Sequence, residues 1–279
     1  MLYLVIFVFP ILINSQVLDT DLSDGLNAEG VSIKYLEGSS EPFKGNVFNY
    51  YPNGNRELKG NYSRGLKEGK WVWWYPDGEK NKTGYYVRSL EDSIWQWWFK
   101  NGQLMKRGKY KKGKKEGRWS EWYEDGTLAN SFGYINDKPN GKCLKKFANG
   151  EKQIEIMYNY GIKSGIEKEW NENGIPVYEN NWRDGLKDGA QIIWAGNGLI
   201  LSKHRYSKGM LHGEYIDYYK SGQKSIVGNY RFGKKHGTWT YSYKDGVVAL
   251  SGNYRNGDPK GSWFWIRANK SEMVNLDDP

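Results

Sequence analysis

Few side chains in this sequence combine the chemistry and the spacing of a catalytic or metal site. Its three histidines are His204, His212 and His236. His212 and His236 hold the same position in adjacent 24-residue repeats, so in a sheet they would stand about 10 Å apart, which is too far for one zinc ion. We expect both to be solvent-exposed turn residues and His204 to be an ordinary strand side chain. The histidines therefore predict neither a metal site nor a catalytic one.

The acidic residues and the glycine pairs give no catalytic pattern either. Asp and Glu recur in turns at the repeat period, where their role in turn formation accounts for them. Gly-x-x-x-Gly spacings, such as Gly113 to Gly117, lack the following helix that a phosphate loop requires. We therefore expect no catalytic residue, no cofactor and no small-molecule substrate, and we predict a protein without enzymatic activity.

Cys143 is the single cysteine, so an internal disulfide is impossible. It occupies the third position of its repeat, where several other repeats have tryptophan. A free cysteine in such a position usually behaves as a small apolar residue. We expect Cys143 to be buried and structural and not a reactive thiol.

One stretch carries more positive charge than the rest of the sequence. Residues 106–118 read K-R-G-K-Y-K-K-G-K-K-E-G-R, with eight basic residues and one acidic residue. Clustered lysines bind anionic surfaces, but lysines on exposed strands also keep a sheet soluble and block edge-to-edge pairing, and both interpretations stay open. The candidate contact residues are Lys106, Arg107, Lys109, Lys111, Lys112, Lys114 and Lys115. Similar turns predict a lysine-lined edge that includes Lys67, Lys163, Lys187, Lys234 and Lys235.

The elements that position these residues repeat every 24 residues. A glycine opens each repeat at 45, 69, 117, 141, 165, 189, 213, 237 and 261, and Ser93 is the one departure. Nine residues further on comes a second glycine, at 54, 78, 102, 126, 150, 174, 198, 222 and 246. Eight residues after that comes an aromatic ring, at 62, 86, 110, 134, 158, 182, 206, 230 and 254. A fixed period of this length indicates a stacked array in which each repeat contacts its neighbours.

Each repeat is typical of a β-hairpin. Aromatic runs such as residues 71–75 have high strand propensity, and the Asn-Gly, Asp-Gly or Ser-Gly pair that follows predicts a tight type I′ turn. A second, looser glycine-rich turn leads to the next repeat. The predicted fold is an all-β, elongated, single-layer antiparallel meander of about nine 24-residue hairpin repeats over residues 45–267. Ladders of rings, one starting at Tyr50 and one at Tyr51, should cover both faces of the sheet.

The two ends differ from the array. Residues 1–15 are an apolar run followed by a polar stretch, typical of a signal peptide, although cleavage and retention as an anchor both stay open. Residues 16–44 are expected to be a linker and a degenerate capping repeat with a strand at Val31, Ile33 and Tyr35. Residues 268–279 read as a polar tail. We therefore expect export to the periplasm, the cell surface or the medium.

The pattern resembles MORN repeats, and more closely the MORN-variant repeats of bacterial proteins that are often called antitoxin-like. The carrying motif is G-x-W-x-x-[WY]-[YF]-x-[ND]-G, then G-x-Y, then G-x-x-x-G, of which residues 213–237 show one full copy. The resemblance covers residues 45 to 267. It implies an extended hairpin array that serves as a scaffold or binding platform, associated in some members with phospholipid and in others with neutralisation of a toxin.

Three non-enzymatic functions remain open. The net charge of +9 and the pI of 9.2 favour acidic partners, so the leading hypothesis is an exported scaffold that binds a protein or an anionic envelope surface. A second is a glycan-binding module with aromatic ladders, which requires exposed tryptophans between Trp73 and Trp122. A third is an antitoxin or immunity protein. Acidic lipid or glycan fits the charge, whereas export argues against nucleic acid.

Overall fold

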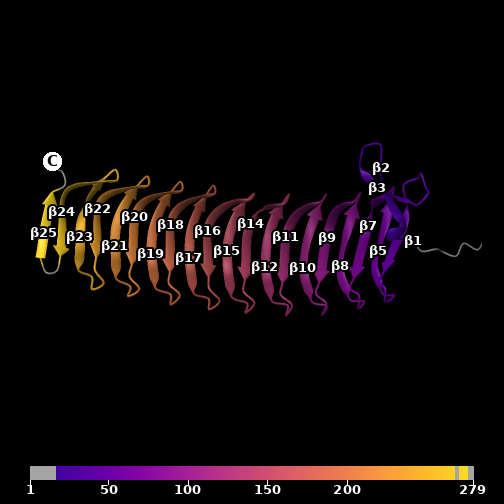
Figure 1. The fold of residues 1–279 in the computed structure, drawn as a ribbon, viewed down its shortest axis with the longest axis horizontal. Helices are drawn as coiled ribbons and strands as arrows, with labels where there is room; N and C mark the ends of the chain where they lie inside the picture. The colour runs from indigo at the N-terminus through magenta and orange to yellow at the C-terminus, as the bar shows by residue number, and fades with distance from the viewer. Residues whose placement is uncertain (1–16, 268–269, 276–279) are drawn as a thin grey trace, which may run out of the picture. The chain divides into compact units, whose positions relative to one another are not determined.

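The computed structural model describes residues 17–267 and 270–275. The expected signal peptide, residues 1–15, lies outside the described residues. The described residues form two compact units, which divide between Lys114 and Lys115. In each unit antiparallel hairpins follow one another in chain order (Figure 1). The predicted open meander of β-hairpins is therefore confirmed, and the described residues contain no α-helix.

The first unit begins with elements that lie outside the repeat pattern. Strand β1 (Val17–Leu18) pairs in parallel with β4, and a 3-10 turn, η1 (Asp19–Asp21), follows it. Strands β2 (Leu22–Leu26) and β3 (Ser32–Leu36) form a separate two-stranded sheet. Ile33 and Tyr35 lie in β3 as expected, whereas Val31 precedes it. The backbone of β3 reaches the array through Lys34, whose N–H donates to the carbonyl of Gly65 at 2.9 Å.

The array of the first unit consists of antiparallel strands that pair in chain order. They are β4 (Gly45–Tyr50), β5 (Arg56–Ser63), β6 (Leu66–Lys67), β7 (Gly69–Trp74), β8 (Lys80–Val87), β9 (Leu90–Trp98) and β10 (Leu104–Lys111).

The second unit continues the same plan, and its first strand, β11 (Lys114–Trp122), begins at the boundary between the units. The strands that follow are β12 (Leu128–Ile135), β13 (Lys138–Pro139), β14 (Gly141–Lys146), β15 (Lys152–Asn159), β16 (Ile162–Trp170), β17 (Pro176–Arg183), β18 (Leu186–Trp194), β19 (Ile200–Ser207), β20 (Met210–Tyr218), β21 (Lys224–Arg231), β22 (Lys234–Ser242), β23 (Val248–Arg255), β24 (Asp258–Arg267) and β25 (Lys270–Asn275). The segment predicted as a polar tail thus contains a strand, β25, that pairs with β24.

The turn within each repeat is not the predicted type I′ turn. At Pro76-Asp77-Gly78 the Gly78 N–H donates to the carbonyl of Tyr75 at 2.9 Å, and only the glycine has positive φ, at 94°. This is a three-residue hairpin loop, in which a type I turn is followed by a left-handed glycine. The Asp77 carboxylate accepts the N–H of Glu79 at 3.1 Å. Asp and Asn are therefore favoured here as side-chain acceptors, and they do not adopt positive φ themselves.

The type I′ turns instead connect consecutive repeats, where the sequence predicted looser turns. Arg64 and Gly65 have φ of 52° and 72° and lie between the paired residues Ser63 and Leu66. Two consecutive positive φ values in a two-residue loop define this turn type. The same geometry recurs at residues 88–89, 112–113, 136–137, 160–161, 184–185, 208–209, 232–233 and 256–257.

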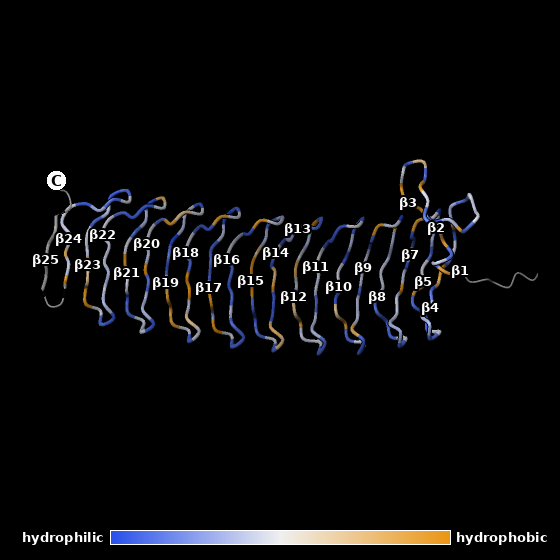
Figure 2. The backbone as a smooth tube through the Cα atoms, in the orientation of Figure 1, coloured by the Kyte–Doolittle hydropathy of each residue, from blue (hydrophilic) through white to orange (hydrophobic). Residues whose placement is uncertain are grey.

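The core is built one strand at a time from a tryptophan and a glycine. In β7 the indole of Trp71 is fully buried, and it lies so close to Gly60 in β5 that a Cβ atom on that glycine would overlap the ring. Gly84 and Trp95 repeat this arrangement in the first unit, and Gly228 with Trp239 and Gly252 with Trp263 repeat it in the second. Figure 2 shows hydrophilic, intermediate and hydrophobic stretches along the strands. A thin sheet can bury a large ring in this way because glycine leaves the backbone open to it.

Rings occur on both faces, as predicted. On the face opposite Trp71, the guanidinium of Arg56 lies 5.3 Å from the ring centre of Phe48 and 5.6 Å from that of Trp74. The tyrosines of the second predicted ladder lie at the start of the three-residue turns and connect repeats. Tyr51, for example, donates its hydroxyl to the carbonyl of Trp74 at 2.8 Å.

Candidate functional site

The predicted basic stretch covers β10, the turn that follows it and the first residues of β11. Along β10, alternate residues face opposite sides of the strand. Lys106 is half-buried, with its ammonium 5.7 Å from the ring centre of Trp97. Arg107, Lys109 and Lys111 project from the other face and are exposed. The stretch therefore presents three cations together and places Lys106 apart from them.

The face that carries these three cations also exposes apolar side chains. Lys109 is the cross-strand partner of Ile94 in β9, and Ile94 is 43% exposed. On β8, Tyr85 is 42% exposed and Val87 is 48% exposed. Exposed cations and exposed apolar groups thus occupy neighbouring strands of one sheet face.

The remaining members of the stretch have other surroundings. Lys112 is exposed in a type I′ turn at φ 52°, and its N–H donates to the Asp92 carboxylate at 3.1 Å. That hydrogen bond lowers the pKa of Asp92 from its usual value. Lys114 is exposed. Lys115 belongs to the second unit, where its ammonium lies 4.9 Å from the ring centre of Trp119.

The predicted lysine-lined edge is wrong for most of its members. The ammonium of Lys67 lies 4.6 Å from the ring centre of Trp71, and that of Lys235 lies 4.4 Å from that of Trp239. Lys163 and Lys187 lie over Trp182 and Tyr206 in the same way. These lysines lie in the strands after the type I′ turns, on the side of the sheet that carries the tryptophans. Their ammonium groups therefore lie over the rings as cation–π partners. Burial lowers the pKa of Lys67 and of Lys187.

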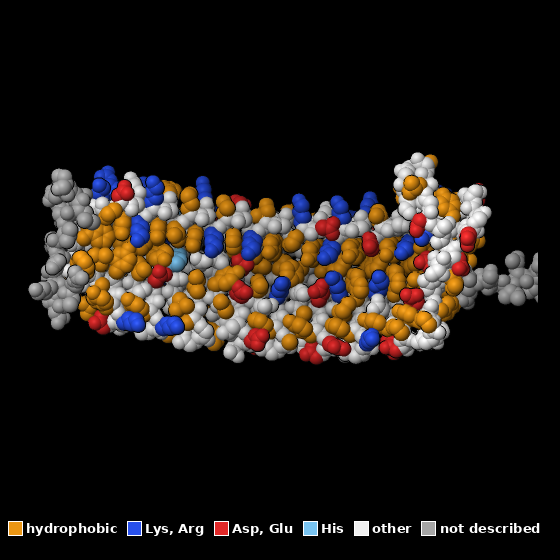
Figure 3. Space-filling model, in the orientation of Figure 1, with side chains coloured by type: hydrophobic (Ala, Val, Ile, Leu, Met, Phe, Trp, Pro, Cys, Tyr) orange, Lys and Arg blue, Asp and Glu red, His pale blue; other side chains and the backbone are white. Residues whose placement is uncertain are grey.

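Figure 3 shows such a face, with a band of hydrophobic side chains interspersed with lysine and arginine. In the first half of the second unit, pairs with at least one polar member replace the glycine–tryptophan pair. In three consecutive repeats the pairs are Ile156 and Glu167, Asn180 and Gln191, and His204 and Tyr215. Glu167, Asn180 and Gln191 are buried. The sequence analysis did not identify these residues. The signal was present, because the glycine at position sixteen of one repeat and the tryptophan at position three of the next are replaced together.

The buried side chains of Glu167, Asn180 and Gln191 have hydrogen-bond partners. The Glu167 carboxylate accepts hydrogen bonds from Lys163 Nζ and Trp182 Nε1, both at 2.8 Å. Gln191 Nε2 donates to Asn180 Oδ1 at 2.7 Å. Burial, with the Glu167 charge nearby, raises the pKa of Tyr178. Such satisfied pairs are compatible with a structural role.

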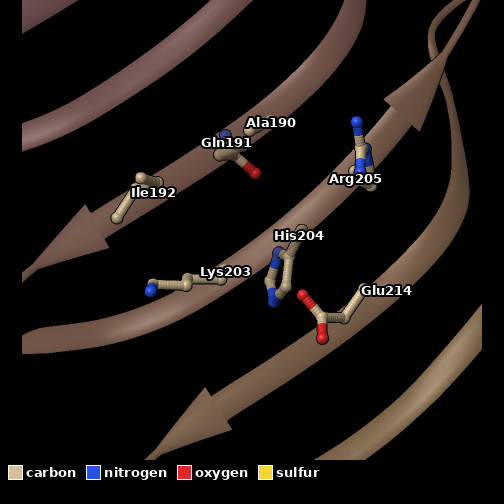
Figure 4. A pocket seen from close by; sticks show the side chains of 7 residues that line it. All are labelled: Ala190, Gln191, Ile192, Lys203, His204, Arg205 and Glu214. Atoms are coloured by element: carbon tan, nitrogen blue, oxygen red, sulfur yellow. The ribbon is translucent and has the colours of Figure 1, made fainter.

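His204 belongs to the last of these pairs and is more than an isolated strand side chain. Its ring stacks on Tyr215 with centroids 4.0 Å apart and planes 7° apart, and its Nε2 lies 2.9 Å from Asp217 Oδ1. An open hollow of about 140 Å³ adjoins it. Figure 4 shows the lining side chains, which include those of Gln191, His204 and Glu214, on three successive strands.

The other two histidines correct the sequence prediction. His212 and His236 are half-buried in β20 and β22, not exposed in turns. His212 Nδ1 accepts the N–H of Phe232, the first residue of the next type I′ turn, at 3.3 Å. Glu68 and Asp92 do the same for Arg88 and Lys112. The position therefore caps the neighbouring turn, which explains its preference for acceptors.

Cys143 is buried as predicted, and burial raises the pKa of its thiol. Among residues 17–267 and 270–275, no three His, Cys, Asp or Glu side chains gather in a way that would hold a metal ion. Over the same described ranges the chain forms no helix with the length and apolar composition that a membrane crossing requires.

Comparison with known proteins identifies the repeat. A family model described as MORN repeat variant matches residues 44–64, 67–88, 91–112, 115–136, 211–231 and 235–256. The interval between the fourth and the fifth match, residues 137–210, contains Glu167, Asn180 and Gln191. The family pattern is thus interrupted where polar pairs replace the glycine–tryptophan pairs.

Two solved structures show low similarity. A crystal structure of TcdB2-TccC3 is 10% identical, with 91% of this chain and 17% of that chain covered at a TM-score of 0.20. A crystal structure of TcdB2-TccC3-Cdc42 is 9% identical, with 92% and 16% covered at a TM-score of 0.19. The chain thus spans less than a fifth of the length of either. Among curated proteins, no sequence matches this chain.

Proposed function

The chain belongs to the MORN-repeat family, and we propose that it is an exported, non-enzymatic scaffold that binds an anionic envelope surface. The apolar run of residues 1–15 supports export. The observation that carries the proposal is the exposed face of β8, β9 and β10, where Arg107, Lys109 and Lys111 lie beside Ile94 and Tyr85.

The chemistry of this face fits the boundary of an anionic bilayer. Each lysine or arginine close to an anionic lipid surface contributes about 1 kcal/mol. Arg107, Lys109 and Lys111 project from one face of one strand and so reach one surface together. The exposed ring of Tyr85 and the exposed side chain of Ile94 add apolar area that the headgroup region accommodates. The charges and the apolar contacts therefore both favour binding to an anionic bilayer.

The burial of the tryptophans on both faces of the sheet favours this function over glycan binding. Stacking on sugars requires exposed indoles, yet Trp95 and Trp119 are buried and Trp73, Trp97 and Trp122 are half-buried. Trp74 and Trp98 are also half-buried. The rings cover one another and the backbone, so aromatic ladders give less support to a glycan partner than the exposed cations give to an anionic one.

The test is a vesicle-binding assay with the purified protein. Co-sedimentation with vesicles of phosphatidylglycerol and phosphatidylcholine is compared with phosphatidylcholine alone while salt rises from about 0.05 M to about 0.5 M. We expect binding to the anionic vesicles at low salt and release as salt rises. Absence of binding at low salt, or equal binding to neutral vesicles, would contradict the proposed function.

A further inference from the structure

The ring ladder of the second unit has a gap in β14. Position three of the repeat holds Cys143, and position five holds Lys145. In the first unit these positions hold Trp71 and Trp73, whose rings stack with centroids 5.7 Å apart. Both indoles are thus replaced in β14 by side chains without a ring.

Open hollows adjoin this gap on the same face of the second unit. One has a volume of about 280 Å³ and is lined by Phe132, Cys143, Lys145, Ile156, Tyr158 and Glu167, among others. The other, of about 200 Å³, shares Phe132 and Lys145 and reaches Trp119 and Tyr134. An apolar cavity of roughly 150 Å³ is enough to bind benzene. The larger hollow is open and is bordered by rings, by aliphatic side chains and by the charged groups of Lys145, Lys163 and Glu167, and its volume accommodates a planar aromatic group.

The charges around the hollows favour an anion. The linings of the two hollows hold three cations, Lys115, Lys145 and Lys163, and two carboxylates, Glu121 and Glu167, so one positive charge is in excess. Glu167 forms an ion pair with Lys163 at 2.8 Å. Lys145 is exposed, and within the part of the chain that the structure describes its ammonium makes no ion pair or hydrogen bond. A carboxylate next to an aromatic ring would supply the partner that this ammonium lacks.

We propose that the hollow beside Cys143 and Lys145 binds a small aromatic carboxylate, with the ring in the space vacated by the indoles and the carboxylate on Lys145. The site lies in residues 115–279 and uses none of Arg107, Lys109 and Lys111. It is therefore independent of the binding of an anionic surface through β10.

Calorimetric titration of the full chain with 2-naphthoate tests the proposal, with uncharged 2-naphthamide as the matched ligand. We expect naphthoate to bind and naphthamide to bind more weakly. Lys145→Gln should weaken naphthoate binding about tenfold and leave naphthamide unaffected. Lys220→Gln removes the same charge from an exposed turn and should change neither ligand. Failure of wild-type protein to bind naphthoate, or equal effects of the two lysine variants, would overturn the proposal.

A second test of the proposed site fills the hollow with a larger side chain. The double variant Phe132→Gly with Cys143→Trp recreates the glycine–tryptophan pair that Gly228 and Trp239 form in the same unit. It should abolish naphthoate binding while the thermal melt stays cooperative. Lys145→Trp, which places an indole where Trp73 stands in its own repeat, serves the same purpose if the double variant does not fold. Undiminished binding in a folded, filled variant would show that the ligand lies elsewhere and would refute the site.

Discussion

The indole of Trp239 lies against the backbone of Gly228 in the adjacent strand, so closely that a Cβ atom on Gly228 would overlap the ring. The indole Nε1 also donates to the carbonyl of Asn229 at 3.1 Å. The sheet depends on this contact because glycine alone lets a large ring approach the backbone of a single layer.

Gly228→Ala should therefore destabilise the protein. Overpacking of this kind typically costs about 1–3 kcal/mol, and we expect that loss in the free energy of unfolding measured by chemical denaturation. Gly196→Ala is the control, because no atom lies within 4 Å of a Cβ at that position and its φ is not positive. Equal stability of the two variants would show that Trp239 does not require a glycine beneath it.

Replacing His204 by glycine and Tyr215 by tryptophan should preserve stability only when both changes are made together. Tyr215→Trp alone enlarges a ring already stacked on His204 at 4.0 Å and removes one hydrogen bond to Asp217. His204→Gly alone removes the other hydrogen-bond partner of Asp217. In a double-mutant cycle we expect the double variant to be more stable than the sum of the single changes implies, with a coupling of about 0.5–3 kcal/mol. Additive changes in the free energy of unfolding would mean that the two positions do not compensate each other.

The repeat, the hairpins and the open meander could be predicted from sequence because glycines, aromatic residues and turn pairs recur at a fixed spacing. The type I′ turn was predicted within each repeat, but it lies between repeats. Within the repeat, Asp77 accepts a hydrogen bond from the backbone of Glu79, which favours a type I turn in which only Gly78 has positive φ. Local pairs such as Asn-Gly or Asp-Gly are compatible with both turn types, and the loop length decides between them.

The site could be predicted only in part. Arg107, Lys109 and Lys111 were found from charge alone, but alternation along β10 separates them from Lys106. The lysines over rings, such as Lys67, were misassigned because a position two residues after a turn looks like an exposed edge. The buried polar side chains of Glu167, Asn180 and Gln191 were missed because only the joint change of the third and the sixteenth repeat positions indicates them.

Ser93 holds the one opening position that lacks glycine, and its φ is 59°. A left-handed backbone strains a residue with a Cβ by roughly 1–2 kcal/mol. Ser93→Gly should therefore raise the free energy of unfolding by about 0.5–1 kcal/mol, after the greater freedom of glycine in the unfolded chain is subtracted. Ser93→Ala, which keeps the Cβ, should give no gain. A stabilising alanine with a neutral glycine would reverse this interpretation.

Asp92 makes the stability depend on pH in the acid range. The hydrogen bond from the Lys112 N–H lowers its pKa in the folded protein, so the ionised form stabilises the fold above the unfolded pKa of about 3.9. That stabilisation is lost as pH falls through the lower folded pKa. In thermal melts at decreasing pH, Asp92→Asn should show a smaller loss of melting temperature below about pH 4 than wild type. An unchanged acid dependence would mean that this carboxylate does not link pH to stability.

The binding of an anionic surface through β10 is tested most directly by charge reversal at matched positions. One variant carries Arg107→Glu, Lys109→Glu and Lys111→Glu. The other carries Lys220→Glu, Lys224→Glu and Lys234→Glu, three exposed lysines of the second unit. Each lowers the net charge from +9 to +3, since three reversals remove six charges. The fraction bound to phosphatidylglycerol vesicles at low salt should fall to background only in the first variant, with both melting as wild type does. Equal loss in the two variants would show that net charge alone binds the vesicles, and undiminished binding of the first would contradict the assignment to β10.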